Sequence, residues 1–154
     1  MNAAVLATAV ARLVGQPTWD GRIGIGSFLQ VEIGPPGPRG PGDGRDYGAH
    51  HLWFYGCAWE IRDGDRVVAT SEDAPERMRR AANLLSGTRV VETRLDGSLV
   101  KLVLESGVML TSLPPEDAAL TDAADDLPEW FLHTPSVVVA MHADGTVTTE
   151  GDES

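Results

Sequence analysis

A single cysteine, Cys57, stands among the 154 residues of this chain, so no internal disulfide can form. This excludes the disulfide-stabilised scaffolds of small secreted proteins and favours a reducing compartment. No stretch approaches the roughly 20 consecutive apolar residues that a membrane-spanning helix needs. The alanine-rich N-terminus lacks the basic start of a signal peptide, and Arg12 and Gln16 interrupt its apolar run. We therefore expect a cytoplasmic protein with no membrane association.

Basic residues are missing from the last third of the chain. Residues 102–154 contain 11 of the 23 acidic residues and no Lys or Arg, whereas residues 1–101 contain 12 acidic and 12 basic residues. The net charge of −11 therefore arises entirely in the last third. Such a charge repels nucleic acid and attracts a basic protein, although a solvated acidic surface can also serve solubility alone. The residues expected to face a basic partner are Glu116, Asp117, Asp122, Asp125 and Asp126.

Linear motifs of catalysis, nucleotide binding and metal binding are also absent. The glycines of residues 21–26 lack the order of a dinucleotide-binding loop and precede a predicted strand instead of a helix. No Gly-x-Ser-x-Gly elbow, Cys-x-x-Cys pair or His-x-x-x-His pair occurs. We therefore predict no metal and no cofactor, and we favour a protein without catalytic activity. An enzyme is not excluded, because a site assembled from distant strands leaves no linear motif.

Hydrophobic periodicity predicts two amphipathic helices, over residues 3–14 and 73–86. Ser71 or Asp73 is expected to cap the second helix, with Pro75 in its first turn. The other apolar segments are separated by Asp-Gly and Ser-Gly turns, which is typical of antiparallel hairpins. Strands are predicted over residues 18–25, 28–33, 50–61, 66–70, 89–95, 99–105, 108–113, 130–134 and 137–142. The expected fold class is α+β, with a predominantly antiparallel sheet, strongly curled or barrel-like, and two helices.

A chain of this length favours one domain, which we place over residues 1–150. A flexible loop is expected over residues 34–49, where six of the 16 residues are Gly and four are Pro. Such a segment buries too little apolar surface to offset the entropy that it loses on ordering. Residues 151–154 are expected to form a disordered acidic tail.

The segment of residues 50–61 is the most aromatic part of the chain. In one continuous strand, alternate side chains from His51 to Trp59 share a face. Their rings form either a core layer or a partly open cleft for a small ligand or for an anchoring side chain of a partner protein. The candidate ligand-binding residues are Trp53, Tyr55, Trp59, Trp130, His51 and His133.

Two less favoured interpretations involve the same segment. Sheet pairing can bring His51 near His133, and a carboxylate would then complete a metal site. Cys57 can act as a nucleophile if one of these histidines serves as its base. A cysteine between aromatic residues of a strand is usually an inert core residue, however, so we predict neither a catalytic residue nor a metal ligand.

The order of several short motifs resembles that of a family of small actinobacterial proteins. The motifs are Leu13-Val14-Gly15-Gln16-Pro17, Gly24-Ile25-Gly26-Ser27-Phe28-Leu29, Ser71-Glu72-Asp73, Trp130-Phe131-Leu132-His133-Thr134-Pro135 and, most specific, the core strand His51-Leu52-Trp53-Phe54-Tyr55-Gly56-Cys57-Ala58-Trp59. The resemblance covers most of the chain and implies a shared fold without a particular activity. By analogy alone, some small proteins of this kind are immunity proteins that neutralise a toxin.

Two functions therefore stand as alternatives. The first is a non-catalytic binding protein, immunity-like, that engages a basic protein partner through an acidic surface. The second is a small-molecule-binding protein or small enzyme whose cleft is lined by aromatic and histidine side chains.

Overall fold

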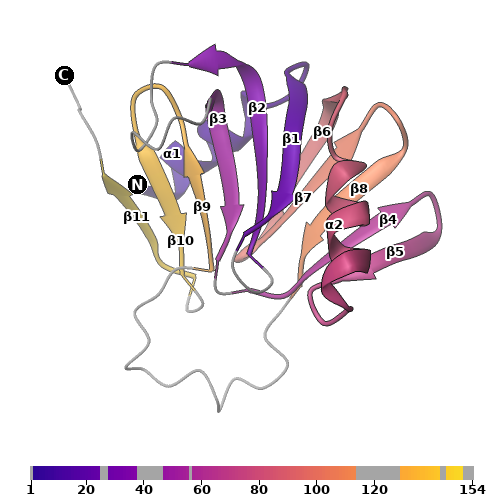
Figure 1. Ribbon diagram of the computed structural model, residues 1–154. Helices are drawn as coiled ribbons and strands as arrows, with labels where there is room; N and C mark the ends of the chain where they lie inside the picture. Colours follow the sequence, from indigo (N-terminus) through magenta and orange to yellow (C-terminus); the bar gives the residue numbers. More distant parts are fainter. Residues whose placement is uncertain are drawn as a thin grey trace.

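The computed structural model describes residues 2–24, 28–37, 47–55, 57–113, 129–142 and 145–150. The strands pair antiparallel in one sheet of order β11-β10-β9-β3-β2-β1-β6-β7-β8-β4-β5, which does not close into a barrel (Figure 1). This confirms the α+β class with two helices. The elements are α1 (Asn2–Ala11), β1 (Pro17–Ile23), β2 (Leu29–Gly37), β3 (Tyr47–Phe54), β4 (Trp59–Asp63), β5 (Arg66–Thr70), α2 (Pro75–Asn83), β6 (Thr88–Asp96), β7 (Leu99–Leu104), β8 (Val108–Ser112), β9 (Trp130–His133), β10 (Val138–Met141) and β11 (Val147–Glu150).

Two halves of the sheet meet at a narrow junction between β1 and β6. In Figure 1 the half from β11 to β1 lies on the left and the half from β6 to β5 on the right. At this junction the two strands pair at two positions, Pro17 with Arg89 and Thr18 with Thr88. Apolar side chains of both halves belong to one core cluster. The Trp130 indole of β9 also donates a 2.9 Å hydrogen bond to the Ser98 carbonyl between β6 and β7, so the two halves face each other across that core.

Strict alternation along the strands builds this core. In β7, Val100, Leu102 and Leu104 are buried while the residues between them are partly exposed. The same pattern recurs in β8. Because successive side chains of a strand point to opposite faces, these two strands contribute every second residue to the core. The largest fully buried side chains are Trp59, Trp130 and Phe54.

Helix α1 packs on the core through a narrow apolar stripe. Leu6 and Val10 of the helix and Leu13 in the turn after it are buried, whereas Val5 is 41% exposed. The helix contacts β11 and β6, and in Figure 1 it lies behind the strands of the left half. The turn after it ends at Gly15, whose φ of 88° suits glycine and whose amide donates to the Val90 carbonyl. The end of α1 is thereby fixed to β6.

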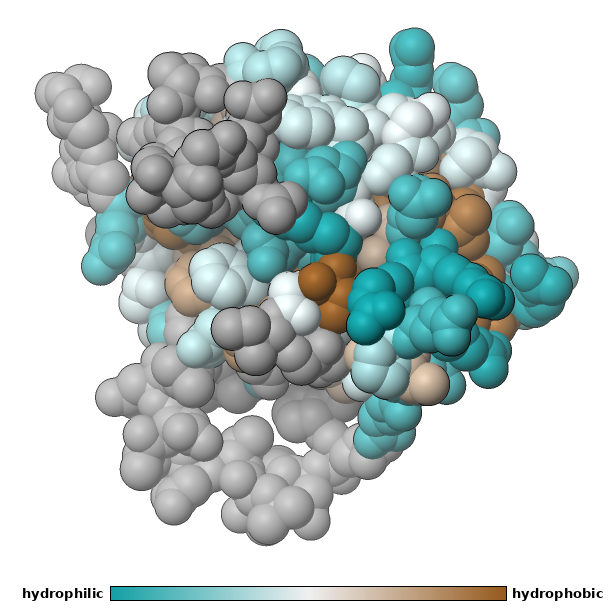
Figure 2. Space-filling model, in the orientation of Figure 1, coloured by the Kyte–Doolittle hydropathy of each residue, from teal (hydrophilic) through white to brown (hydrophobic). Residues whose placement is uncertain are grey.

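Helix α2 packs closely against β1. A Cβ at Gly21 would lie 2.2 Å from the Ala82 carbonyl oxygen, so only glycine permits this approach. Met78, Ala81 and Ala82 are buried against the sheet. The opposite side of the helix presents a hydrophilic strip to solvent (Figure 2), made by Glu76, Arg77, Arg79 and Arg80.

The predicted turns of the right half are confirmed. Gly64, Gly97 and Gly107 adopt positive φ angles of 63°, 59° and 95° between consecutive paired strands. Glycine reaches this region without a steric penalty, which explains the Asp-Gly and Ser-Gly signals. The expected side-chain cap of α2 is wrong. The N-cap residue is Ala74, which has no side chain that can cap the helix. The carboxylate of Asp73 instead accepts a hydrogen bond from the Thr70 amide, and the hydroxyl of Ser71 accepts one from the Trp59 amide.

Two predictions about chain segments also need correction. The bounds predicted for the loop, residues 34–49, are wrong at both ends, because residues 34–37 extend strand β2 and residues 47–49 begin strand β3. The remaining loop residues, 38–46, lie outside the described residues, as do 151–154 of the expected tail. The single strand expected over residues 50–61 is instead two strands, β3 and β4, which pair with different neighbours. Strand β11 was not predicted.

In the parts of the chain that the structure describes, neither helix is long and apolar enough to cross a membrane.

Replacing Trp59 by alanine is expected to lower the free energy of unfolding by ~3–5 kcal/mol, because this indole is fully buried in the core. Urea denaturation measures the loss. Val91→Ala serves as a control, since Val91 is 44% exposed and its truncation should change stability by about 0.5 kcal/mol or less. Near-wild-type stability of the Trp59 variant would contradict the core position.

Candidate functional site

A bulge in β1 sets the position of a charged cluster on the sheet face opposite the core. Trp19 pairs with Glu32 and Arg22 with Gln30, so β1 contains one residue more than β2 over this stretch. The extra residue falls at Asp20 and Gly21, and Asp20 has a φ of 50°. Because one inserted residue reverses the alternation of side chains, Arg22 reaches the same face as Glu32.

Glu32 is completely buried, yet all its contacts complement a negative charge. Its Oε2 lies 2.9 Å from Nη1 of Arg22 and 2.5 Å from Nδ1 of His51. Its Oε1 accepts a 2.8 Å hydrogen bond from the Gly48 amide. A Cβ at Gly48 would lie 2.9 Å from the Ile33 carbonyl oxygen, so glycine allows the close approach of β3 to β2 there.

These contacts decide the charge of Glu32. Burial raises the pKa of this carboxyl, but the hydrogen bond and charge of His51, the Gly48 amide and Arg22 together lower it below the ordinary value. Glu32 is therefore an ionised carboxylate at neutral pH, and Nδ1 of His51 carries the proton that it donates to Oε2. This fixes the orientation of the His51 ring, as a carboxylate does for histidines in many functional sites.

Strand pairing places the two histidines side by side. In the pairing of β3 with β9, His51 lies directly opposite His133, and their ring centroids are 5.5 Å apart. The sheet thus brings these residues together, as one of the interpretations of the sequence required. Within the described ranges, no group of three or more His, Cys, Asp or Glu side chains has a geometry that could hold a metal ion.

The histidines continue into a layer of aromatic rings. Trp53 lies opposite Phe131, and their centroids are 5.5 Å apart. Tyr55 is 5.3 Å from Trp53 and stacks on Phe28 at 4.6 Å. We call this group the aromatic surface; its members are Phe28, His51, Trp53, Tyr55, Phe131 and His133. All except His51, which is buried, are partly exposed.

Of the six candidate ligand-binding residues, four belong to the aromatic surface: His51, Trp53, Tyr55 and His133. Trp59 and Trp130 lie elsewhere, because both are fully buried in the core. The break between β3 and β4 at residues 55–58 separates Trp59 from Trp53. Trp130 lies opposite Phe54, on the core face of β9.

Four members of the combined site were not among the candidate residues chosen from the sequence: Arg22, Glu32, Phe28 and Phe131. The alternation of β2 correctly places Glu32 on the face away from Val31, but gives no reason for its burial. Its contact with His51 follows from the register of the β2–β3 hairpin, where these two residues are directly opposed. Knowledge of this strand register would have identified Glu32 as the partner of His51.

The five acidic residues expected to face a partner lie in segment 114–128, outside the described residues. The two ends of this segment are defined, however. The Leu113 amide donates to the Ala58 carbonyl at 2.8 Å, and the Tyr55 amide donates to the Glu129 carbonyl at 3.0 Å. The two described residues that flank the segment are therefore fixed, Leu113 beside Ala58 and Glu129 beside Tyr55 of the aromatic surface.

Cys57 lies in the same break and packs against the core. It is partly buried. Burial raises the pKa of its thiol far above the ordinary value, and the negative charge of Glu129 raises it further. Glu129 is itself buried, which raises the pKa of its carboxyl. This environment holds the thiol in its unreactive protonated form.

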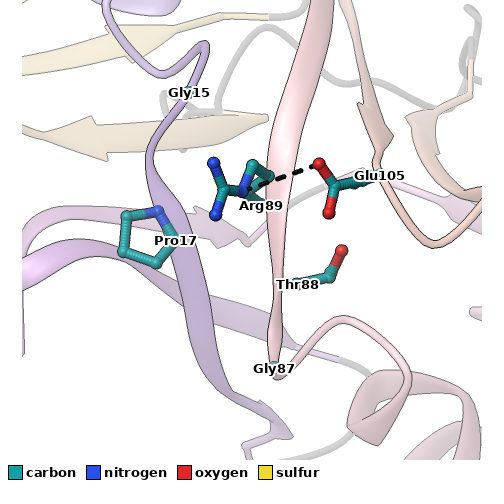
Figure 3. A pocket seen from close by; sticks show the side chains of 6 residues that line it. All are labelled: Gly15, Pro17, Gly87, Thr88, Arg89 and Glu105. Carbon is teal, nitrogen blue, oxygen red and sulfur yellow. Dashed lines mark ion pairs between the residues drawn. The ribbon is translucent and has the colours of Figure 1, made fainter.

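A separate hollow of ≈270 Å³ lies between the start of β1, the start of β6 and the residue after β7 (Figure 3). Arg89 and Glu105 face each other in it, with 3.7 Å between Nε and Oε2. Both side chains are well exposed, so their attraction is weak. The hollow shares no residue with the aromatic surface; its lining consists of Gly15, Pro17, Gly87, Thr88, Arg89 and Glu105.

The arrangement suggests two kinds of chemistry. Partly exposed rings can receive an apolar or cationic group of a ligand or partner. The oriented His51 donates its Nδ1 proton to the carboxylate of Glu32 and lies directly opposite His133, so the pair can bind or move a proton. Comparison of the chain with protein-family models, with curated proteins and with solved structures finds no match.

Glu32→Gln is expected to lower the free energy of unfolding by about 3 kcal/mol at neutral pH, because it leaves Arg22 and His51 without their buried counter-charge. The pKa of Glu32 is lowered in the folded state, so the wild-type advantage is present above the ordinary pKa of about 4.3. It is lost as the pH falls through the lowered folded value. Urea denaturation at pH 7 and at a pH well below the ordinary value of about 4.3 measures the difference. The exposed Asp96, changed to Asn, is the control, and a pH-independent effect of Glu32→Gln would contradict this account.

Cys57 is expected to react with a thiol reagent at least ~100-fold more slowly in the folded protein than in the unfolded chain, since the raised pKa removes the thiolate. Labelling with and without denaturant, followed by mass spectrometry, provides the two rates. Glu129→Gln should increase the native rate by removing a negative charge next to the thiol. Equal rates in folded and unfolded protein would restore Cys57 as a candidate nucleophile.

Proposed function

We propose that this protein is a non-catalytic binding protein whose partner is a basic protein. The observation that carries the proposal is the position of the aromatic surface beside the two attachment points of the acidic segment 114–128. The acidic segment thus rejoins the described chain, at Glu129, next to an anchoring site for side chains. An immunity-like role, in which the partner is a basic toxin, is one form of this function.

The aromatic surface supports the proposal through its composition and exposure. Phe28, Trp53, Tyr55 and Phe131 are in mutual contact and partly exposed on the face of the sheet opposite the core. Trp and Tyr are enriched among the residues that dominate binding energy in protein interfaces, since they bury large areas with few rotatable bonds. The ionised Glu32 beneath them fixes the neighbouring His51 and so rigidifies the same face.

The charge distribution supports a basic partner. Segment 114–128 contains five acidic residues and no basic one. Exposed charges of one sign accelerate the association of an oppositely charged protein and impose a strong dependence on salt. The acidic segment would therefore steer the partner, and the rings would hold it.

A second candidate function is the binding or conversion of a small molecule at the histidine pair. It is favoured by the 2.5 Å contact between Glu32 and His51, because a carboxylate that orients an imidazole is a common arrangement for proton transfer. The acidic segment has no role in this alternative. Salt dependence of binding therefore separates the two functions.

The test replaces Glu116, Asp117, Asp122, Asp125 and Asp126 by the matching amides and measures binding to the protein captured by the wild type. Association should slow by about tenfold or more at roughly 0.1 M salt, with little change in dissociation. At roughly 1 M salt, where the Debye length falls to about 3 Å, wild type and variant should associate at similar rates.

A matched control carries the same change in net charge at five other acidic positions. These positions are exposed and lie away from the segment: Asp63, Asp65, Glu72, Glu92 and Asp96. The control variant should associate nearly as fast as the wild type. If the two variants slow association equally, or if the rate does not depend on salt, the acidic segment does not steer the partner and the small-molecule alternative is favoured.

A further inference from the structure

Two imidazole rings lie next to each other on the sheet face opposite the core. His51 of β3 and His133 of β9 are directly opposed in the strand register, and their ring centroids are 5.5 Å apart. Opposed residues of antiparallel strands have Cβ atoms about 4.5–5.5 Å apart, which keeps both side chains within reach of one ion. His133 is partly exposed, so the pair can be approached from solvent.

The separation of the two rings suits a shared metal ion. A zinc ion lies about 2.0–2.1 Å from an imidazole nitrogen, so two rings bound to one tetrahedral ion have centroids about 5.2 Å apart. The observed 5.5 Å between His51 and His133 is close to this separation. The ring of His133 can turn toward the ion, because the last torsion of a histidine side chain is broad.

The contact between His51 and Glu32 prepares His51 as a metal ligand. Nδ1 of His51 donates to Oε2 of Glu32, so the lone pair of the neutral ring lies on Nε2. Metal-binding histidines almost always donate their other ring nitrogen to a carboxylate, a carbonyl or water, which fixes the ring and makes the ligating nitrogen more basic. The Gly48 amide and Arg22 hold the same carboxylate in place. Glu32 thus acts through His51 and is not itself a ligand.

We propose that His51 and His133 bind a divalent ion of a late first-row transition metal, Cu²⁺ most tightly, with Glu32 as the positioning residue of His51. Imidazole suits Cu²⁺, Ni²⁺ and Zn²⁺, and the affinity of such a site is highest for Cu²⁺. In the described part of the chain no third His, Cys, Asp or Glu side chain completes a metal-binding group, so the site has two protein ligands there. Its other coordination positions are open to water or to a small ligand. This inference does not depend on the basic partner proposed above.

Isothermal titration calorimetry of the full chain near neutral pH, in a buffer that does not bind metals, tests the site. Cu²⁺ should bind with one ion per chain, and more tightly than Ni²⁺ or Zn²⁺. Mg²⁺ should not bind, because it prefers oxygen ligands and gives up its water reluctantly. Electron paramagnetic resonance of the Cu²⁺ complex should show coupling to the nitrogen nuclei of two imidazoles.

His133→Ala truncates a partly exposed side chain and is the decisive variant. It should weaken Cu²⁺ binding at least about tenfold, since even the loss of an outer-shell partner costs that much, and it should leave coupling to one imidazole. His51→Ala should have the same effect. Glu32→Gln should weaken binding by about 10–100-fold while the signal of two imidazoles is retained, as expected for a positioning residue. His142→Ala, which removes a histidine that contacts Thr148, is the control and should bind Cu²⁺ like the wild type.

Thermal melting without metal checks that each variant is folded, and His133→Ala decides alone if the variants of the buried His51 and Glu32 are not. Cu²⁺ binding that is undiminished in His133→Ala would mean that the ion is held elsewhere, and it would overturn the proposal. A wild type that binds no Cu²⁺, or that shows no coupling to imidazole nitrogen, would overturn it equally. None of these results bears on the salt dependence by which the basic partner is tested.

Discussion

The carboxylate of Glu32 imposes the constraint on which this face of the protein depends. A buried and unpaired carboxylate would cost several kcal/mol, so the surrounding strands must supply complementary groups. Two neighbouring strands do so: β1 through Arg22, and β3 through His51 and the Gly48 amide. The bulge in β1 and the glycine in β3 are the backbone features that make these contacts possible. The orientation of His51, and through it the start of the aromatic surface, follows from the same carboxylate.

The sheet separates two roles by face. One face contributes every second residue to a core shared by both halves of the sheet, and Trp130 closes that core by reaching the turn between β6 and β7. The other face of β2, β3 and β9 is left to the charged cluster and the rings. Substitutions on the core face therefore act mainly on stability. On the proposed function, those on the other face act on recognition, apart from Glu32, whose replacement also lowers stability. The narrow junction between β1 and β6 allows one continuous sheet to enclose its own core.

Local patterns predicted the fold well because each hairpin carries its own turn signal. The glycines at 64, 97 and 107 and the alternation of β7 and β8 depend on neighbouring residues alone. The site depends on features that lie between strands. The register of β3 against β9 joins His51 to His133, and the one-residue bulge in β1 turns Arg22 toward Glu32; neither is visible in a linear pattern. Trp59 was wrongly predicted to share a face with Trp53 because the chain breaks between β3 and β4. A continuous apolar run does not reveal where one strand ends and the next begins beside other neighbours.

The attachment of segment 114–128 at both ends has a consequence for how the protein can bind. A chain of 15 residues fixed at both ends beside residues 55–58 keeps every one of its charges within about 30 Å of an attachment point, since each residue spans at most ~3.5 Å. On the proposed function, a partner that touches either the charges or the rings would meet the other contact as an intramolecular event at high effective concentration. Two individually weak contacts would then act as one bivalent site, and a partner that offers only basic charge or only an apolar anchor would gain little from the pair.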